Sequence, residues 1–182
     1  MIKSITFKTD WRCFKAGEHF KIDPGLNLLV GDQGTGKSSV VTLFKWAISN
    51  HPELKRVADI EADSIEVWVF DFEKDNPRAC KYVKSSLNVT MLFRAHGECV
   101  LDILSTMKKG GDKKTFVLDE PDMALSIRSI NKIIAMFRGT HHQIIAAVHN
   151  PLLISAFPKV LSVEHKRWMS SDEFVQSHTL QI

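Results

Sequence analysis

The feature that most constrains this chain is a glycine-rich segment, Gly31-Asp32-Gln33-Gly34-Thr35-Gly36-Lys37-Ser38. It fits the pattern Gly-x4-Gly-Lys-Ser, in which glycines let the backbone curl until successive N–H groups point at one anion. An apolar run at 26–30 precedes the segment, and apolar residues at helical spacing follow it over 40–48. Strand, glycine loop and helix in this order predict a phosphate-binding loop, to which the helix N-terminus adds partial positive charge.

The side chains of this loop indicate how a nucleotide and its metal would be held. We expect Lys37 to reach the β- and γ-phosphates of ATP. We expect the Ser38 hydroxyl to contact Mg²⁺, because this ion needs only one or two protein oxygens. The other positions expected to contact the nucleotide are Gly31, Gln33, Gly34, Thr35, Gly36 and Ser39. The sequence thus predicts ATP and Mg²⁺ as the bound cofactors.

A second motif, far along the chain, supplies carboxylates. A short apolar strand, expected at 115–119, ends in Asp119-Glu120-Pro121. Two adjacent acids at the end of a buried strand are costly to bury without a cation. We therefore expect Asp119 to hold Mg²⁺ through its water shell and Glu120 to polarise the attacking water. An exposed acidic turn would explain these residues alone, but not their combination with a phosphate loop.

A histidine closes a third apolar run. His149 follows residues 144–148 and precedes Asn150-Pro151, so we expect it at the carboxyl end of a strand, where open α/β sheets keep their ligands. A histidine in this position, taken alone, would be interpreted as structural. The two preceding motifs favour a catalytic role, in which His149 donates a hydrogen bond to the γ-phosphate.

With these residues the chain resembles the ABC-type ATPases. A segment similar to the family's D-loop is present as well, Met123-Ala124-Leu125-Ser126. Asp119 and His149 are 30 positions apart by subtraction, which leaves room for one helix and one strand. The apolar face expected for that helix comprises Ile127, Ile130, Ile133, Ile134 and Phe137. The resemblance implies an α/β fold of the P-loop NTPase type, with a mixed, mainly parallel sheet flanked by helices.

The N-terminal part resembles the heads of RecF-type and SMC-type DNA-maintenance ATPases more than a transporter cassette. An alternating strand, expected at 2–7, is followed by Trp11-Arg12-Cys13-Phe14, where those heads carry an aromatic-Arg-x-aromatic turn. The resemblance implies that Arg12 contacts the nucleotide and that Trp11 or Phe14 lies near the base. The two rings are equally well explained as core or rim aromatics.

The Ser-Gly-Gly-Gln signature of the family is replaced in this chain. The best candidate is Ala95-His96-Gly97-Glu98, 24 positions before Asp119 by subtraction. In ABC dimers this loop and its helix cap the γ-phosphate bound by the other subunit. The resemblance therefore implies that His96, Gly97 and Glu98 contact ATP across a homodimer interface. Because Ala95 lacks the serine hydroxyl, this contact is either weakened or supported by His96; an ordinary helix start is the alternative.

No glutamine occupies an obvious Q-loop position. The strand expected at 65–72 ends in a polar turn, where Asp71, Glu73 or Asn76 would either reach the metal or simply be solvated. The pair His141-His142 does not suggest a metal site, because the alternation of a strand would send the two rings to opposite faces.

Composition is that of one compact domain. With 182 residues and 44% hydrophobic content, we expect a single ABC-type ATPase domain over residues 1–182. The net charge of +3 is too small to indicate nucleic acid by itself, and the basic cluster at 108–114 is either a solvated loop or a contact to a DNA backbone. The cysteines show no paired spacing, and no apolar run of about 18 residues is visible. We therefore expect a cytoplasmic protein without a membrane segment.

These observations predict an ABC-type ATPase that binds and hydrolyses MgATP and dimerises when ATP occupies the interface. The leading biological hypothesis is a head acting in DNA maintenance, replication, repair or phage-related defence, with DNA or an effector protein as partner. The alternatives are a transporter-type nucleotide-binding subunit and a non-catalytic module that senses ATP by assembly. Salt-sensitive DNA binding, copurification with a membrane subunit, or assembly without turnover would distinguish the three.

Overall fold

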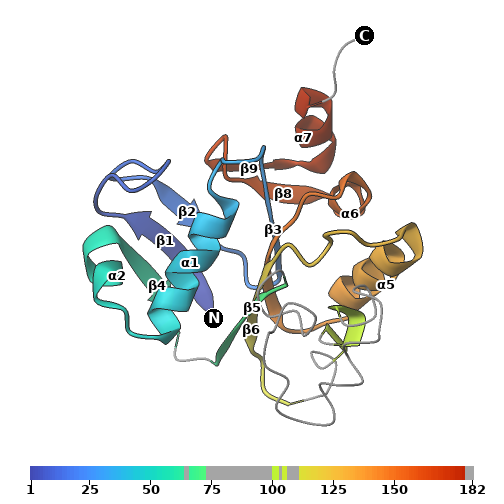
Figure 1. The fold of residues 1–182 in the computed structure, drawn as a ribbon, viewed down its shortest axis with the longest axis horizontal. Helices are drawn as coiled ribbons and strands as arrows, with labels where there is room; N and C mark the ends of the chain where they lie inside the picture. The colour runs from blue at the N-terminus through green and yellow to red at the C-terminus, as the bar shows by residue number, and fades with distance from the viewer. Residues whose placement is uncertain (64–65, 73–99, 103, 106–110, 179–182) are drawn as a thin grey trace.

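The computed structural model describes the chain except for residues 64–65, 73–99, 103, 106–110 and 179–182. Its described part contains a six-stranded sheet in the order β5-β6-β7-β3-β8-β9 and a three-stranded sheet in the order β2-β1-β4 (Figure 1). The larger sheet consists of β3 (Leu26–Val30), β5 (Val67–Asp71), β6 (Thr115–Asp119), β7 (Gln143–Ala147), β8 (Lys159–Ser162) and β9 (Arg167–Ser170). The smaller sheet consists of β1 (Ile2–Phe7), β2 (His19–Lys21) and β4 (Ala58–Ala62).

The larger sheet is parallel except at one edge, where β9 runs antiparallel to β8. The helices around the sheets are α1 (Lys37–Ile48), α2 (Pro52–Val57), α5 (Ile127–Arg138), α6 (Pro151–Ser155) and α7 (Ser171–His178). In Figure 1, α1 lies on the side of the smaller sheet, and α5 and α6 lie on the opposite side. The predicted fold class, a mixed and mainly parallel sheet flanked by helices, is confirmed.

The alternation of side chains along the central strands creates two cores. Leu29 and Ile145 pack with α1 and the smaller sheet, whereas Leu28 and Ala146 pack with α5, α6 and α7. Successive residues of a strand point to opposite faces, and both faces of this sheet are covered. This explains why the strand sequences are continuous apolar runs, and it places the loops that follow β3, β6 and β7 at one edge of a rigid layer.

Helix α5 forms where it was predicted, with one exception on its apolar face. Ser126 caps its N-terminus by accepting a hydrogen bond from the Ser129 N–H at 3.2 Å. The predicted apolar positions that are buried are Ile130, Ile133, Ile134 and Phe137. Ile127 was also predicted on this face, but its side chain is 72% exposed. It is the first residue of the helix and lies before the first turn that contacts the core.

A buried amide joins the two sheets. Gln143 Nε2 donates hydrogen bonds to the carbonyl oxygens of Ile2 and Asp23, both at 2.7 Å. Its Oε1 accepts from the Ile2 N–H at 2.9 Å and from Thr115 Oγ1 at 2.8 Å. A buried amide is stable only when its polar atoms are paired, so these four bonds fix β1 relative to β6 and β7.

The structure does not describe the proposed signature, and it describes the basic cluster only in part. The proposed signature, Ala95 to Glu98, lies outside the described residues, as do Lys108 and Lys109 of the basic cluster. Lys114 of that cluster is described, and its Nζ forms an ion pair with Glu66 at 2.8 Å. Among the helices that the structure describes, none is both long and apolar enough to cross a membrane.

Candidate functional site

The phosphate loop runs from the end of β3 to the start of α1. Gly36 is the N-cap of α1 with φ 104°, and no side chain caps this end of the helix. A Cβ at Gly36 would lie 2.4 Å from Cys13 Sγ and 2.8 Å from the ring of Phe14. Both the backbone conformation and the space therefore require glycine here. The first N–H groups of α1 have no side-chain acceptor at the cap and are available to an anion.

Lys37 folds back onto this loop. Its Nζ donates hydrogen bonds to the carbonyl oxygens of Gly31 at 2.7 Å and Asp32 at 2.9 Å. Burial lowers the pKa of Lys37, whereas nearby carboxylates, with Glu120 first among them, favour the charged form. The ammonium group is thus held at the loop, next to the acids that follow β6.

Ser38 and Asp119 bring two oxygens together beside the loop. Ser38 Oγ donates a hydrogen bond to Asp119 Oδ1 at 3.1 Å. Burial raises the pKa of Asp119, and the negative charges of Asp71 and Glu120 raise this pKa further. The hydrogen bond from Ser38 acts in the opposite direction and lowers the pKa. A divalent cation would favour the charged carboxylate, and a hydroxyl beside a carboxylate is a donor set that Mg²⁺ accepts. These residues therefore fit Mg²⁺.

Glu120 and His149 meet at the carboxyl ends of β6 and β7. His149 Nε2 lies 3.3 Å from Glu120 Oε1. The backbone beside His149 is fixed by the buried carboxylate of Asp122, whose Oδ2 accepts hydrogen bonds from the N–H groups of His149 at 2.8 Å and Asn150 at 2.5 Å. The motif Asp119-Glu120-Pro121-Asp122 thus supplies both a partner for the His149 ring and an anchor for its backbone.

A cavity of about 280 Å³ lies between these groups. Its lining consists of Gln33, Gly34, Gly36, Lys37, Ser38, Ser39, Glu120 and His149. The predicted loop residues and both predicted catalytic residues therefore share one cavity. Gly31 and Thr35, also predicted to contact the nucleotide, shape the loop instead of lining this cavity, since Thr35 Oγ1 donates to the Asp32 carbonyl at 2.8 Å.

The N-terminal turn reaches the same loop through Arg12. Its Nη1 donates a hydrogen bond to Ser39 Oγ at 2.9 Å, and its guanidinium lies 4.5 Å from the centroid of the Trp11 ring. Phe14 is fully buried and stacks on Phe7 with ring centroids 4.2 Å apart, so Phe14 is a core aromatic. Of the two rings considered for the nucleotide base, only Trp11 remains exposed enough to contact one.

Asp71 lies beside this site and is not a solvated loop residue. It is the last residue of β5 and lies opposite Asp119 in the register of β5 and β6. Its side chain is buried, and Oδ2 forms an ion pair with Lys45 Nζ at 2.8 Å. The neighbouring candidates Glu73 and Asn76 lie outside the described residues. The one signal in the sequence was that Asp71, like Asp119, is an acid at the end of an apolar run.

His141 and His142 do not point to opposite faces of a strand, and that prediction was wrong. The two residues lie in the loop before β7, and their ring centroids are 4.0 Å apart. The alternation of a strand does not apply to a loop. His142 Nδ1 accepts a hydrogen bond from the Lys114 N–H at 3.2 Å, which gives this ring a structural role.

A family model described as an AAA domain matches residues 9–136. The chain belongs to this AAA-domain family. The matched range includes the Arg12 turn, the phosphate loop and Asp119-Glu120, and it ends within α5. No curated protein sequence is significantly similar to this AAA-domain chain.

Solved ATPase structures share the fold of this AAA-domain chain. The SMC head domain from Thermotoga maritima matches with a TM-score of 0.58 and 12% identity over 88% of this chain and 94% of that one. The ATP-binding cassette MJ0796, a dimer in a post-hydrolysis state with ADP and Pi, matches with a TM-score of 0.57 and 10% identity over 93% and 97% of the two chains.

A bacterial Atm1-family ABC exporter with ATP bound matches with a TM-score of 0.56 and 15% identity over 99% of this chain. The chain spans 41% of that exporter's length. At these identities the similarity establishes the fold, which is that of an ABC-type P-loop ATPase shared by SMC heads and transporter cassettes. The resemblance seen in the sequence is confirmed.

Proposed function

We propose that residues 1–182 form a single ATPase domain that binds MgATP, hydrolyses it and forms a homodimer around it. The observation that carries this proposal is the shared cavity in which the phosphate loop meets Glu120 and His149, with Asp119 bonded to Ser38 at its edge. The residues proposed to bind the phosphates and Mg²⁺ and to activate water lie within the described residues, whereas the proposed signature, Ala95 to Glu98, lies outside them.

ATP would bind with its phosphates at the N-terminus of α1. Lys37 is bonded to two loop carbonyls at 2.7 and 2.9 Å, and its flexible side chain would exchange these for phosphate oxygens, which are stronger acceptors because they are charged. Arg12, which donates to Ser39, and the half-buried ring of Trp11 would contact the rest of the nucleotide. Ser38 and Asp119 would hold Mg²⁺, which supplies charge neutralisation at the β- and γ-phosphates.

Glu120 would accept a proton from the attacking water or orient it. His149 Nε2 lies 3.3 Å from Glu120 Oε1, so its N–H would orient this carboxylate in the free protein and would donate to the γ-phosphate once ATP is bound. Asp122 would keep His149 in place through its backbone, at 2.8 Å. The charges of Lys37 and Lys45 offset the repulsion among Asp71, Asp119 and Glu120, which lie together at the ends of β5 and β6.

The dimer is supported by the fold shared with MJ0796, which is dimeric with ADP and Pi. In that arrangement His96, Gly97 and Glu98 of one subunit would cap the γ-phosphate bound by the other. ATP that stays bound would stabilise the dimer by its differential affinity for the dimeric state. Hydrolysis would remove this stabilisation.

Glu120→Gln tests hydrolysis and assembly together. The amide keeps the shape of the side chain but removes the base, so ATP should bind and persist, and light scattering should show a dimer with MgATP and a monomer with ADP. Glu53→Gln, at a half-buried residue of α2 whose carboxylate pairs with Arg56, is the matched control and should hydrolyse ATP normally. A Glu120→Gln protein that hydrolyses ATP at the rate of the parent would contradict the catalytic assignment.

We further propose a cytoplasmic role in DNA maintenance, replication, repair or phage-related defence. Its support is the fold shared with an SMC head domain and the basic cluster at 108–114. DNA binding measured at low salt should weaken as salt increases, because each phosphate contact releases counterions. Absence of any DNA affinity at low salt would reject this role and favour a transporter-type subunit, whose fold is shared with the Atm1-family exporter, or an ATP-sensing module.

A further inference from the structure

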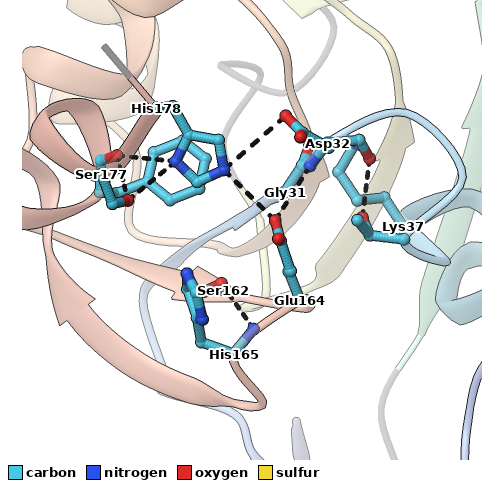
Figure 2. Close-up of polar contacts among 10 residues, drawn as sticks. Gly31, Asp32, Lys37, Ser162, Glu164, His165, Ser177 and His178 are labelled. Atoms are coloured by element: carbon cyan, nitrogen blue, oxygen red, sulfur yellow. Dashed lines mark hydrogen bonds and ion pairs between the residues drawn. The ribbon is translucent and has the colours of Figure 1, made fainter. Parts of the chain in front are cut away.

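Three metal-ligating side chains gather on the other side of the phosphate loop (Figure 2). Asp32 belongs to the loop itself, Glu164 follows β8, and His178 is the last residue of α7. One ligand atom from each residue lies within 4.8 Å of the other two. This cluster uses none of the residues assigned to nucleotide hydrolysis.

The distances within the cluster suit a small divalent cation. His178 Nε2 lies 3.2 Å from Glu164 Oε2 and 3.7 Å from Asp32 Oδ1. Ligands about 2.1 Å from a tetrahedral Zn²⁺ are separated from one another by about 3.4 Å. The two distances from His178 lie on either side of that value, and the two carboxylates offer oxygens within 4.8 Å of each other, so the three side chains can approach one ion.

The ring of His178 is held so that Nε2 points at the two acids. Its Nδ1 lies 2.9 Å from the Phe174 carbonyl oxygen and 2.9 Å from Ser177 Oγ. An Nδ1–H donated to the backbone carbonyl leaves the lone pair on Nε2, which is the tautomer that binds a metal. A hydrogen bond from the ring nitrogen that does not bind the metal is the usual way in which a protein orients a histidine ligand.

A cavity of about 300 Å³ borders the cluster. Asp32 and His178 line it, together with Gly31, Gln33 and Phe174 among others. It leaves room for water or another ligand to complete the coordination of an ion held by only three side chains. A divalent ion would balance both negative charges of Asp32 and Glu164, whereas protonation of His178 would balance only one of the two charges.

We propose that Asp32, Glu164 and His178 form a binding site for a divalent transition metal, represented by Zn²⁺. One imidazole nitrogen with two carboxylate oxygens is a set that Zn²⁺ accepts, whereas Mg²⁺ prefers oxygen ligands. The ion would connect α7 to the phosphate loop. Because Asp32 lies in that loop, metal and nucleotide would influence each other's affinity by the same factor.

The test is a calorimetric titration of Zn²⁺ into the full chain, freed of metal and of any histidine tag, with excess Mg²⁺ and no nucleotide present. The parent protein should bind one equivalent more than His178→Ala. Glu164→Gln, which keeps the shape of the side chain and leaves α7 unchanged, should weaken the same site by about tenfold or more. His141→Ala removes an exposed histidine elsewhere and is the matched control, expected to titrate like the parent.

Co²⁺ provides a readout of the ligands themselves. Its visible absorption bands should appear when it is added to the parent protein and should lose intensity in His178→Ala, while far-UV circular dichroism checks that both proteins are folded. If His178→Ala and Glu164→Gln bind Zn²⁺ as the parent does, the three residues are an ion-paired cluster and the proposal is wrong. The result does not depend on ATP, so it is separate from the test of hydrolysis.

Discussion

Gly36→Ala tests how tightly the phosphate loop packs against the N-terminal turn. At φ 104° an alanine would cost roughly 1–2 kcal/mol in backbone strain. Its Cβ would also lie 2.4 Å from Cys13 Sγ and 2.8 Å from Phe14 Cζ. Cys13 is exposed and can turn away, but Phe14 is fully buried against Phe7, so this overlap would cost roughly 1–3 kcal/mol more. We expect the free energy of unfolding to decrease by roughly 2–5 kcal/mol.

Gly34→Ala is the matched control in the same loop. Gly34 has φ 84°, and a Cβ there would meet nothing within 4 Å, so only the backbone term of roughly 1–2 kcal/mol applies. Urea unfolding followed by far-UV circular dichroism measures both variants on one scale. Equal losses of stability in Gly36→Ala and Gly34→Ala would refute the reasoning, because the contact with Phe14 would then contribute nothing.

Lys37→Ala should weaken MgATP binding about 100-fold, or roughly 3 kcal/mol, without unfolding the protein; unchanged affinity in a titration would contradict its role. Lys45→Met removes the 2.8 Å ion pair of the buried Asp71 and should lower the free energy of unfolding, measured with urea, by roughly 2–3 kcal/mol. This loss is smaller than for a fully buried pair because the Lys45 side chain is 35% exposed, and Lys45→Arg should retain most of the stability. His149→Ala should lower kcat about 100-fold with little change in KM, and the opposite pattern would indicate a binding role. Replacing the basic cluster residues Lys108, Lys109, Lys113 and Lys114 by glutamine should flatten the salt dependence of any DNA binding; an unchanged slope would exclude the cluster from the contact.

The residues that meet at the nucleotide cavity could be predicted to lie together because each of them belongs to a local motif. Lys37 and Ser38 follow a glycine pattern, and Asp119 and His149 each end an apolar run, so strand order alone brings them to one edge of the sheet. Asp71 also ends a strand, but its sequence context does not reveal that β5 pairs with β6. Its role depends on that register.

The remaining features depend on contacts that no local pattern encodes. Phe14 and Trp11 occupy similar sequence positions in one turn, and only the packing against Phe7 decides which ring is buried. Glu164 and His178 are 14 residues apart in unremarkable polar sequence, and they meet Asp32 only because β9 reverses the chain and α7 returns to the phosphate loop. Long-range contacts of this kind are set by tertiary structure and not by periodicity.

The strand order predicts that α7 unfolds locally before the strand that carries the phosphate loop. β3, which carries the phosphate loop, pairs with strands on both sides, whereas β9 is the last strand of the described sheet and α7 packs on that edge. Local unfolding starts in elements with fewer buried contacts, so the amides of α7 should exchange with deuterium before those of β3. Transient release of α7 would withdraw His178 from Asp32 while leaving the nucleotide cavity assembled. We therefore expect α7 to open as a unit without displacing Lys37, Glu120 or His149.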